Sequence, residues 1–207
     1  MEKLYNDEFE EIYLKYGFAL KMLETELDIL LKSYSYEKGV DPVEHIKSRV
    51  KTPESAIKKL EKKGYEINSH NLLKHVHDLI GIRIVCSFLS DVYDIVNLIK
   101  KSKQFKIKEE KDYIEKPKPT GYISYHIIIE VPIYLNDGIE YIDAEIQIRT
   151  IAMDFWASLD HKLQYKAEAK NISQETVEEI YKCSLDIKNL DKKMNELNNK
   201  INGSANK

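Results

Sequence analysis

Residues 141–149 (YIDAEIQIR) alternate between polar and apolar side chains. Successive side chains of a β-strand point to opposite faces, so this segment predicts a strand with one isoleucine-rich face and one polar face. The polar face would carry Tyr141, Asp143, Glu145, Gln147 and Arg149. Two carboxylates two residues apart repel each other, which water tolerates but which is also typical of a divalent-cation site. The alternation fits either a solvated sheet face, the commoner use, or a face that binds a metal.

A shorter polar alternation precedes it, on the strand expected just before in the chain. Tyr122, Ser124 and His126 share one face of that segment. If the two polar faces coincide, an aromatic ring, a hydroxyl and an imidazole would lie beside the carboxylates. That combination would favour a functional face over a solvated one.

Residues 75–83 (HVHDLIGIR) place further polar groups around an apolar run. Asp78 comes just before the run, where its carboxylate can reach a metal. Arg83 interrupts the run, so its charge must be paired or must bind an anionic or aromatic group; a salt bridge to the polar strand is the simpler alternative. His75 and His77 could suggest zinc, but no other histidine or cysteine has a usable ligand spacing nearby.

The common phosphate-binding motifs, GxxxxGK[ST] and GxGxxG, do not occur in the sequence. If nucleotides bind, cationic side chains must neutralise the phosphates. Those available near the motifs are Arg49, Lys51, Lys58, Arg83, Lys111 and Arg149. Residues 100–118 are also rich in lysine, which fits either a binding surface or a solvated one.

Helical spacing and capping signals predict the elements that must position these groups. Apolar residues recur at helical spacing from Phe9 to Leu30, which predicts a long N-terminal helix. The sequence DPVE at 41–44 has the order of a helix start with a capping box. Further helices are expected at 52–64, 90–101 and 150–166.

The strands are expected between these helices. Apolar, β-branched runs and a turn signal at 136–138 (NDG) predict strands near 79–89, 106–114, 123–131 and 140–149, with the last two paired as a hairpin. The sum is a mixed α/β fold, with a mixed sheet of about four or five strands flanked by helices and long helices at both ends. We divide it into an N-terminal helix (1–40), a central domain (41–167) and a C-terminal helix (168–207).

The C-terminal helix carries a heptad seam, defined here as Ile180, Cys183, Ile187, Leu190, Met194, Leu197 and Ile201. This seam could pair with another subunit or fold back on the body of the same chain. A cysteine and a methionine make it weaker than a strong zipper.

Composition and charge argue against several classes of protein and favour one compartment. The 207 residues have a net charge of −3, which argues against a general nucleic-acid coat. Two distant cysteines suggest no disulfide framework and favour a reducing compartment. The acidic start lacks an apolar signal core, and no apolar run is long enough for a membrane span. We therefore expect a cytoplasmic protein.

Six ordered segments resemble the RelA/SpoT-type synthetase domain, and more closely the short single-domain alarmone synthetases of the RelQ type. They are SRVKTPES (48–55), HDLIGIRI (77–84), KDYI (111–114), KPTGYISYH (118–126), EIQIRT (145–150) and MDFWASLDHK (153–162). The match runs from about residue 40 to 166. It implies a fold related to nucleotidyltransferases, a homotetramer, and transfer of the β,γ-pyrophosphate of ATP to the 3′-hydroxyl of GTP or GDP to give (p)ppGpp.

The resemblance also implies a role for each matching residue. Asp78 and Glu145 would hold Mg²⁺, and Glu145 would accept the proton from the ribose hydroxyl. The ATP site would comprise Arg49 and Arg83 around the adenine and Lys51 and Lys58 near the phosphates. The GTP or GDP site would comprise Tyr122, stacked on guanine, with Lys111, His126, Gln147 and Arg149.

Two positions depart from the family pattern. Ile123 fills a place where the family usually has arginine or lysine, so one cationic contact is lost, although this side chain should point away from Tyr122. Asp154 stands where close relatives often have an asparagine that helps bind an activating alarmone. A carboxylate would repel phosphates there, which argues against activation by pppGpp.

Two other hypotheses stay open at this point. One is a different nucleotidyltransferase-like enzyme that uses the same carboxylates on another acceptor. The other is a catalytically silent module that binds nucleotides or single-stranded RNA through the lysine-rich segment and exposed tyrosines. The presence of Asp78, Glu145 and Tyr122 favours the synthetase.

Overall fold

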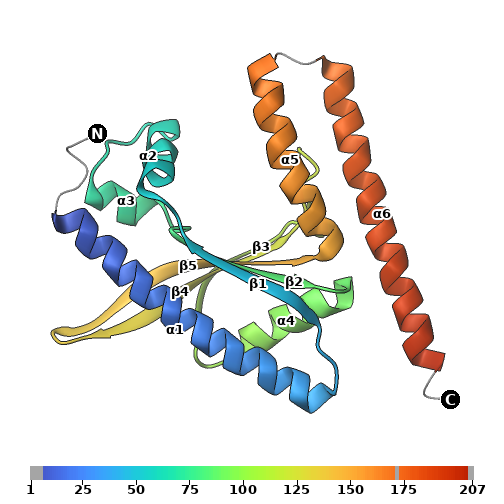
Figure 1. Cartoon of the computed structure of the whole chain (residues 1–207), viewed down its shortest axis with the longest axis horizontal. Helices are drawn as coiled ribbons and strands as arrows, with labels where there is room; N and C mark the ends of the chain where they lie inside the picture. Colours follow the sequence, from blue (N-terminus) through green and yellow to red (C-terminus); the bar gives the residue numbers. More distant parts are fainter. Residues whose placement is uncertain (1–6, 171–172, 205–207) are drawn as a thin grey trace.

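The computed structural model describes residues 7–170 and 173–204; for 7–8, His161, 164–170 and 203–204 it describes the backbone alone. Parts of the expected terminal helices, 1–6, 171–172 and 205–207, therefore lie outside the described residues. The elements run in the order α1 (Asp7–Lys38), β1 (Val43–Val50), α2 (Pro53–Lys62), α3 (Ser69–His75), β2 (Ile80–Cys86), α4 (Leu89–Lys101), β3 (Lys106–Asp112), β4 (Tyr125–Leu135), β5 (Gly138–Thr150), α5 (Ile151–Lys170) and α6 (Gln174–Ser204) (Figure 1).

The five strands form one mixed sheet in the order β1-β2-β5-β4-β3. The central pair, β2 and β5, is parallel, and the other three pairs are antiparallel. A parallel pair needs a crossover connection, which α4, β3 and β4 provide between β2 and β5. The predicted mixed α/β fold with long terminal helices is confirmed.

Isoleucines fill the apolar face of the sheet and form its core. Ile146 of β5 lies opposite Ile82 of β2 on one side and Ile127 of β4 on the other, and all three are buried. Buried residues of α1 and α4, such as Leu27 and Ile95, belong to the same core. Burying a side chain of this size contributes roughly 1.5–3 kcal/mol to stability. Burial of the isoleucines therefore holds the apolar face of each strand toward the core and leaves the polar face on the other side.

The predicted hairpin joins β4 and β5. Leu135 pairs with Gly138, which leaves Asn136 and Asp137 as a two-residue turn. Gly138 has a φ of 146°, a conformation open to glycine and strained for other residues. The turn thus fixes the register that brings the polar residues of β5 beside those of β4.

The predicted helix start at 41–44 is wrong, because these residues lead into β1. Asp41 accepts a hydrogen bond from the backbone N–H of Val43 at 3.1 Å, which forms a turn in place of a helix cap. Glu44 accepts from the Ser87 hydroxyl at 2.6 Å and so makes no capping box. Pairing of β1 with β2 along its length overrides the local signal.

The other helix starts agree with the sequence to within two residues. Thr52 caps α2 by accepting from the N–H of Ser55, and Thr150 accepts from the N–H of Met153 at the start of α5. For α4 the cap lies at Phe88 and not at Ser90, and Asp91 accepts from the Phe88 N–H at 3.0 Å. The short helix α3 was not predicted.

Helices α5 and α6 lie side by side at one end of the sheet, and α6 also contacts α4 (Figure 1). Four members of the heptad seam, Leu190, Met194, Leu197 and Ile201, are nevertheless exposed. The helix therefore folds back on the body of the chain with a different face. Of the two cysteines, Cys86 is buried in the core and Cys183 is exposed on α6. Within the described residues, no helix combines the length and the apolar character needed to cross a bilayer.

Candidate active site

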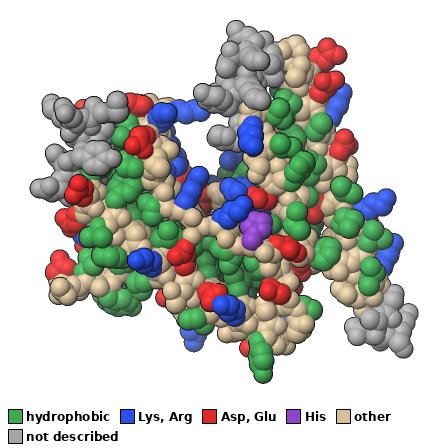
Figure 2. Space-filling model, viewed as in Figure 1, with side chains coloured by type: hydrophobic (Ala, Val, Ile, Leu, Met, Phe, Trp, Pro, Cys, Tyr) green, Lys and Arg blue, Asp and Glu red, His purple; other side chains and the backbone are tan. Residues whose placement is uncertain are grey.

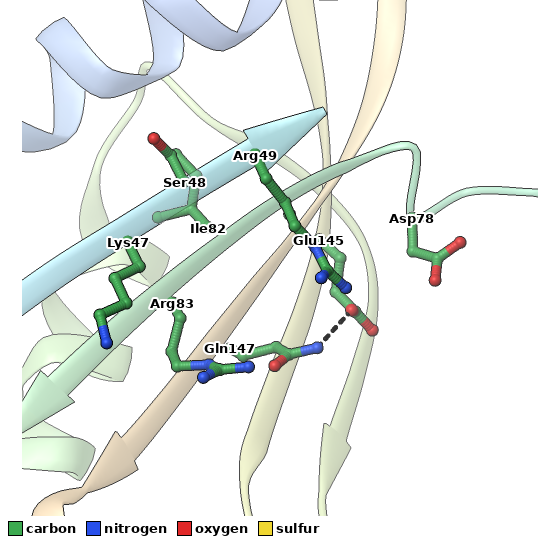
Figure 3. A pocket seen from close by; sticks show the side chains of 9 residues that line it. Lys47, Ser48, Arg49, Asp78, Ile82, Arg83, Glu145 and Gln147 are labelled. Carbon is green, nitrogen blue, oxygen red and sulfur yellow. Dashed lines mark hydrogen bonds between the residues drawn. The ribbon is translucent and has the colours of Figure 1, made fainter. Parts of the chain in front are cut away.

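A cleft of about 410 Å³ opens over the polar side of the central strands. Its lining residues are Lys47, Ser48, Arg49, Asp78, Gly81, Ile82, Arg83, Glu145 and Gln147. Figure 3 shows the side chains of Arg49, Arg83, Gln147 and Glu145 converging from three neighbouring strands, with Asp78 beside them on the loop before β2. Figure 2 shows basic side chains gathered over the middle of the molecule, with acidic ones among them.

Strand register explains why residues far apart in sequence meet here. Lys47, Arg83, Gln147, His126 and Lys111 form one cross-strand row over all five strands. Residues directly opposite each other point to the same face. The polar faces of β4 and β5 therefore coincide, which was the condition for a functional face.

Asp78 is held by two lysines. Its carboxylate accepts from Lys51 Nζ at 2.7 Å and from Lys59 Nζ at 2.8 Å. Burial alone would raise the pKa of Asp78, but the two lysine hydrogen bonds outweigh it and lower the pKa below the ordinary value. Asp78 is therefore ionised at neutral pH and faces the cleft as an anion.

Glu145 accepts hydrogen bonds from two side chains. Its carboxylate accepts from His126 Nδ1 at 2.9 Å and from Gln147 Nε2 at 2.7 Å. Burial would raise the pKa of Glu145, whereas the hydrogen bond from His126 and that from Gln147 lower it, and the net shift is downward. Each of the two predicted carboxylates is thus kept charged in a partly buried place, which is the ionisation state that a metal ligand needs.

A hydrogen-bond chain extends from Glu145 into the cleft wall. A carboxylate only accepts, so Nδ1 of His126 donates to Glu145, and Nε2 of the same ring is hydrogen-bonded to the Tyr122 hydroxyl at 2.8 Å. The Tyr122 hydroxyl in turn accepts from Arg149. The phenol is therefore pinned at its tip, and its ring position is tied to that of Glu145.

Cations lie over the Tyr122 ring. Lys118 Nζ is 4.8 Å from the ring centroid, and the Arg149 guanidinium carbon is 5.2 Å from it. These distances suit a cation–π contact. The next residue, Ile123, is buried in the hydrophobic core, so its side chain turns away from the cleft as expected.

Asp154 joins two arginines. Its carboxylate accepts from Arg83 at 3.0 Å and from Arg149 at 3.2 Å. Arg83 thus has the salt bridge expected from sequence, but the partner lies on α5 and not on the polar strand. The Arg83 Nε–H is buried without a hydrogen-bond partner. Burial lowers the pKa of Arg83, and the nearby Arg149 lowers it further.

Five of the predicted site residues line the cleft: Arg49, Asp78, Arg83, Glu145 and Gln147. The other six are not among its lining residues: Lys51, Lys58, Lys111, Tyr122, His126 and Arg149. Lys58 is exposed on α2, whereas its neighbour Lys59 reaches Asp78. Lys111, at the β3 end of the cross-strand row, forms a salt bridge with Glu109 at 2.9 Å. The sequence reading missed Lys59, although the buried residues Ala56 and Leu60 of α2 could have indicated it. Positions three and four apart share a helix face, so Lys59 follows Ala56 toward the body and Lys58 does not.

The two histidines before Asp78 have separate surroundings. His75 stacks on the ring of Tyr65 with centroids 3.8 Å apart. His77 Nδ1 lies 2.7 Å from the Asp143 carboxylate, which also accepts from Lys108 at 2.9 Å. Asp143 is therefore engaged in a surface network one row away from Glu145.

Comparison with known proteins places the chain in one family. Residues 48–170 match the region found in RelA/SpoT proteins. The GTP pyrophosphokinase YwaC of Bacillus subtilis (strain 168) is 45% identical over 188 residues, which cover 91% of this chain and 89% of that protein. The GTP pyrophosphokinase YjbM of the same strain is 30% identical over 194 residues, with 94% and 90% covered.

Solved structures give the same result. The crystal structure of small alarmone synthetase 2 from Bacillus subtilis superposes with a TM-score of 0.82 at 43% identity, covering 94% of this chain and all of that one. That of small alarmone synthetase 1 from the same organism, bound to its product pppGpp, has a TM-score of 0.85 at 30% identity, with 95% and 99% covered.

The two lysines on Asp78 give a direct test of this site. Replacing Lys59 with Met keeps the aliphatic stem but removes one cation, so the pKa of Asp78 should rise. Carboxyl-carbon NMR of a pH titration measures it. The matched change Lys58→Met should leave this pKa in place. Equal titration of Asp78 in both variants would contradict the assigned contact.

Proposed function

Because this chain belongs to the RelA/SpoT family, we propose that it transfers the β,γ-pyrophosphate of ATP to the 3′-hydroxyl of GTP or GDP. The single observation that carries this proposal is the cleft that Asp78 and Glu145 line together with Arg49, Arg83 and Lys47. Pyrophosphoryl transfer requires little covalent help from the protein and depends on positioning and on charge stabilisation. A cleft with two ionised carboxylates and several cations suits both needs.

Asp78 and Glu145 would hold the Mg²⁺ ion. Mg²⁺ favours one or two carboxylates, with substrate oxygens and water completing its shell, and both side chains are anionic in the same cleft. When bound, Mg²⁺ would supply neutralisation of the charge that develops on the transferred phosphates. Lys51 and Lys59, which both contact Asp78, would donate to phosphate oxygens beside the ion.

The donor nucleotide would lie at the β1–β2 side of the cleft. Arg49 and Arg83 extend from these neighbouring strands and can enclose a purine between planar guanidinium groups (Figure 3). Lys51 and Lys59 are placed for the phosphates, and the geometry favours Lys59 over Lys58 for this role.

The acceptor nucleotide would lie at the β4–β5 side. Tyr122 provides a ring for stacking, which is worth about 1–3 kcal/mol per base, once the base takes the place of Lys118. Lys111, His126, Gln147 and Arg149 follow Tyr122 along this side and can contact the sugar and phosphates. Glu145 would accept the proton of the attacking 3′-hydroxyl, and His126 and Gln147 orient its carboxylate for that step.

We further propose that the chain assembles into a homotetramer through the exposed heptad seam of α6. Apolar residues at this spacing suit helix–helix pairing, and Leu190, Met194 and Leu197 have no cover within the described residues. The proposed organisation is the N-terminal helix at 1–40, the synthetase domain at 41–167 and the assembly helix at 168–207. Two unpaired cysteines support a cytoplasmic location.

The first test is product analysis with each acceptor in turn. Purified protein with ATP, Mg²⁺ and GTP or GDP should form a guanine nucleotide that carries a 3′-pyrophosphate, seen by anion-exchange chromatography and mass spectrometry. Release of AMP without that product would refute the assignment and favour a different acceptor. Nucleotide binding with no turnover would favour the silent binding module.

A second test addresses Glu145. The change Glu145→Gln keeps the shape but removes the proton acceptor and a metal charge, so kcat should fall by at least about 10²–10⁴. Steady-state kinetics measures it, with Glu178→Gln on the exposed side of α6 as the control. Near-normal kcat in Glu145→Gln would remove this residue from the mechanism.

A third test addresses assembly. Replacing Leu190 and Leu197 with Glu places charges in the seam, so the oligomer should dissociate. Multi-angle light scattering measures the mass of the species. Asn199→Glu adds a charge on α6 outside the seam and should preserve the assembly. An unchanged mass in the double variant would show that the seam is not the subunit contact.

A further inference from the structure

Helix α6 presents a polar stripe to the body of the protein, on a different face from its heptad seam. The stripe is defined here as Ser184, Lys188, Asp191 and Asn195, which are spaced four, three and four residues apart and so share one side of the helix. Ser184 and Asp191 are buried. Buried polar side chains cost free energy unless they are hydrogen-bonded, so their partners matter.

The C-terminal part of the stripe anchors α6 to the body. Asp191 accepts from the Thr150 hydroxyl at 2.7 Å, and that same hydroxyl caps α5. Asn195 accepts from the backbone N–H of Ser90 at 2.9 Å, at the start of α4. These hydrogen bonds join α6 to the end of β5, which is part of the sheet, and to α4, which packs against the sheet.

The N-terminal part of the stripe reaches the loop that carries Tyr122. Lys188 Nζ donates to the backbone carbonyl of Ile114 at 3.1 Å. Ser184 packs against Gly121, so closely that a methyl group at Gly121 would overlap the serine hydroxyl. Gly121 has a φ of 81° and its N–H donates to the carbonyl of Lys118 at 2.8 Å. The helix therefore touches both sides of the loop 115–120 and abuts the residue directly before Tyr122.

We infer that α6 is a strut for the acceptor-nucleotide loop, and that Lys188 and Ser184 are positioning residues for the Tyr122 ring. Lys188 holds the residue before the loop through its hydrogen bond to Ile114, and Ser184 limits how closely Gly121 can approach the helix. The hydrogen bonds of Asp191 and Asn195 keep both residues in place by anchoring α6 to the body. No hydrogen bond described between residues 7 and 204 joins the stripe to Arg49, Lys51 or Asp78 on the donor side. The inference rests on the proposed function only in assigning Tyr122 to the acceptor nucleotide.

The strut predicts an effect on one substrate alone. In Lys188→Met the stem remains but the hydrogen bond to Ile114 is lost, so KM and Kd for GDP should rise about two- to tenfold, while KM for ATP stays within about twofold. Steady-state kinetics gives both KM values and calorimetry gives the Kd of GDP. The control Lys192→Met, at an exposed position of α6, should change neither. An equal rise in both KM values, or no rise, would overturn the inference.

Ser184 supplies an independent test of the close approach. Ser184→Ala leaves room for Gly121 and should bind GDP as the unmodified chain does. Ser184→Leu must push the loop outward, so its KM for GDP should rise more than about tenfold. Thermal melting shows whether each variant folds. If Ser184→Leu does not fold, the KM values of Lys188→Met test the inference. If the unmodified chain makes no 3′-pyrophosphorylated product, the proposed function fails, whereas the Kd series with GDP still tests the strut.

Discussion

The parallel register of β2 and β5 determines where the charged groups of the cleft lie. Gly81 pairs with Glu145 and Arg83 with Gln147. Because side chains alternate between faces, a shift of one residue would carry Glu145 into the isoleucine core. Burial of Ile82 and Ile146 therefore holds the carboxylate in the cleft. Gly81 adds room, since a side chain at this position would meet no atom and would project into open space.

Internal ion pairs balance the charge of the cleft. Asp78 has two lysine partners, and Asp154 has two arginine partners. Burial lowers the pKa of Arg83, and the nearby charge of Arg149 lowers it further. The Asp154 carboxylate offsets this repulsion. Asp154 thus has a definite place in the structure, as the counter-ion of both arginines.

The elements set by periodic patterns could be predicted from the sequence. The alternation in 141–149 gave the strand, its polar face and the hairpin, because period-2 patterning and turn chemistry are local properties. The segment 41–44 could not be read in this way. Its Asp-Pro start satisfies either a helix cap or a turn, and only the pairing of β1 with β2, more than thirty residues on, decides between them.

Part of the site could be predicted because side-chain alternation along a strand is a local property of the sequence. Glu145 and Gln147 follow from alternation, and their meeting with Asp78 depends on a parallel pairing that no local pattern specifies. Lys59 was missed because two adjacent lysines differ only in the helix face they occupy. The partners of Asp154 and the polar stripe of α6 arise from tertiary packing between distant segments, which periodicity does not encode.

The contrast between the two cysteines has a practical consequence. The Cys86 thiol is buried in the core and its pKa is raised to about 12, so it stays protonated and out of reach of alkylating reagents. Cys183 is exposed on α6. Because Cys183 belongs to the heptad seam, a maleimide dye would attach to it only where no other subunit covers the seam, so the extent of labelling would report on that cover.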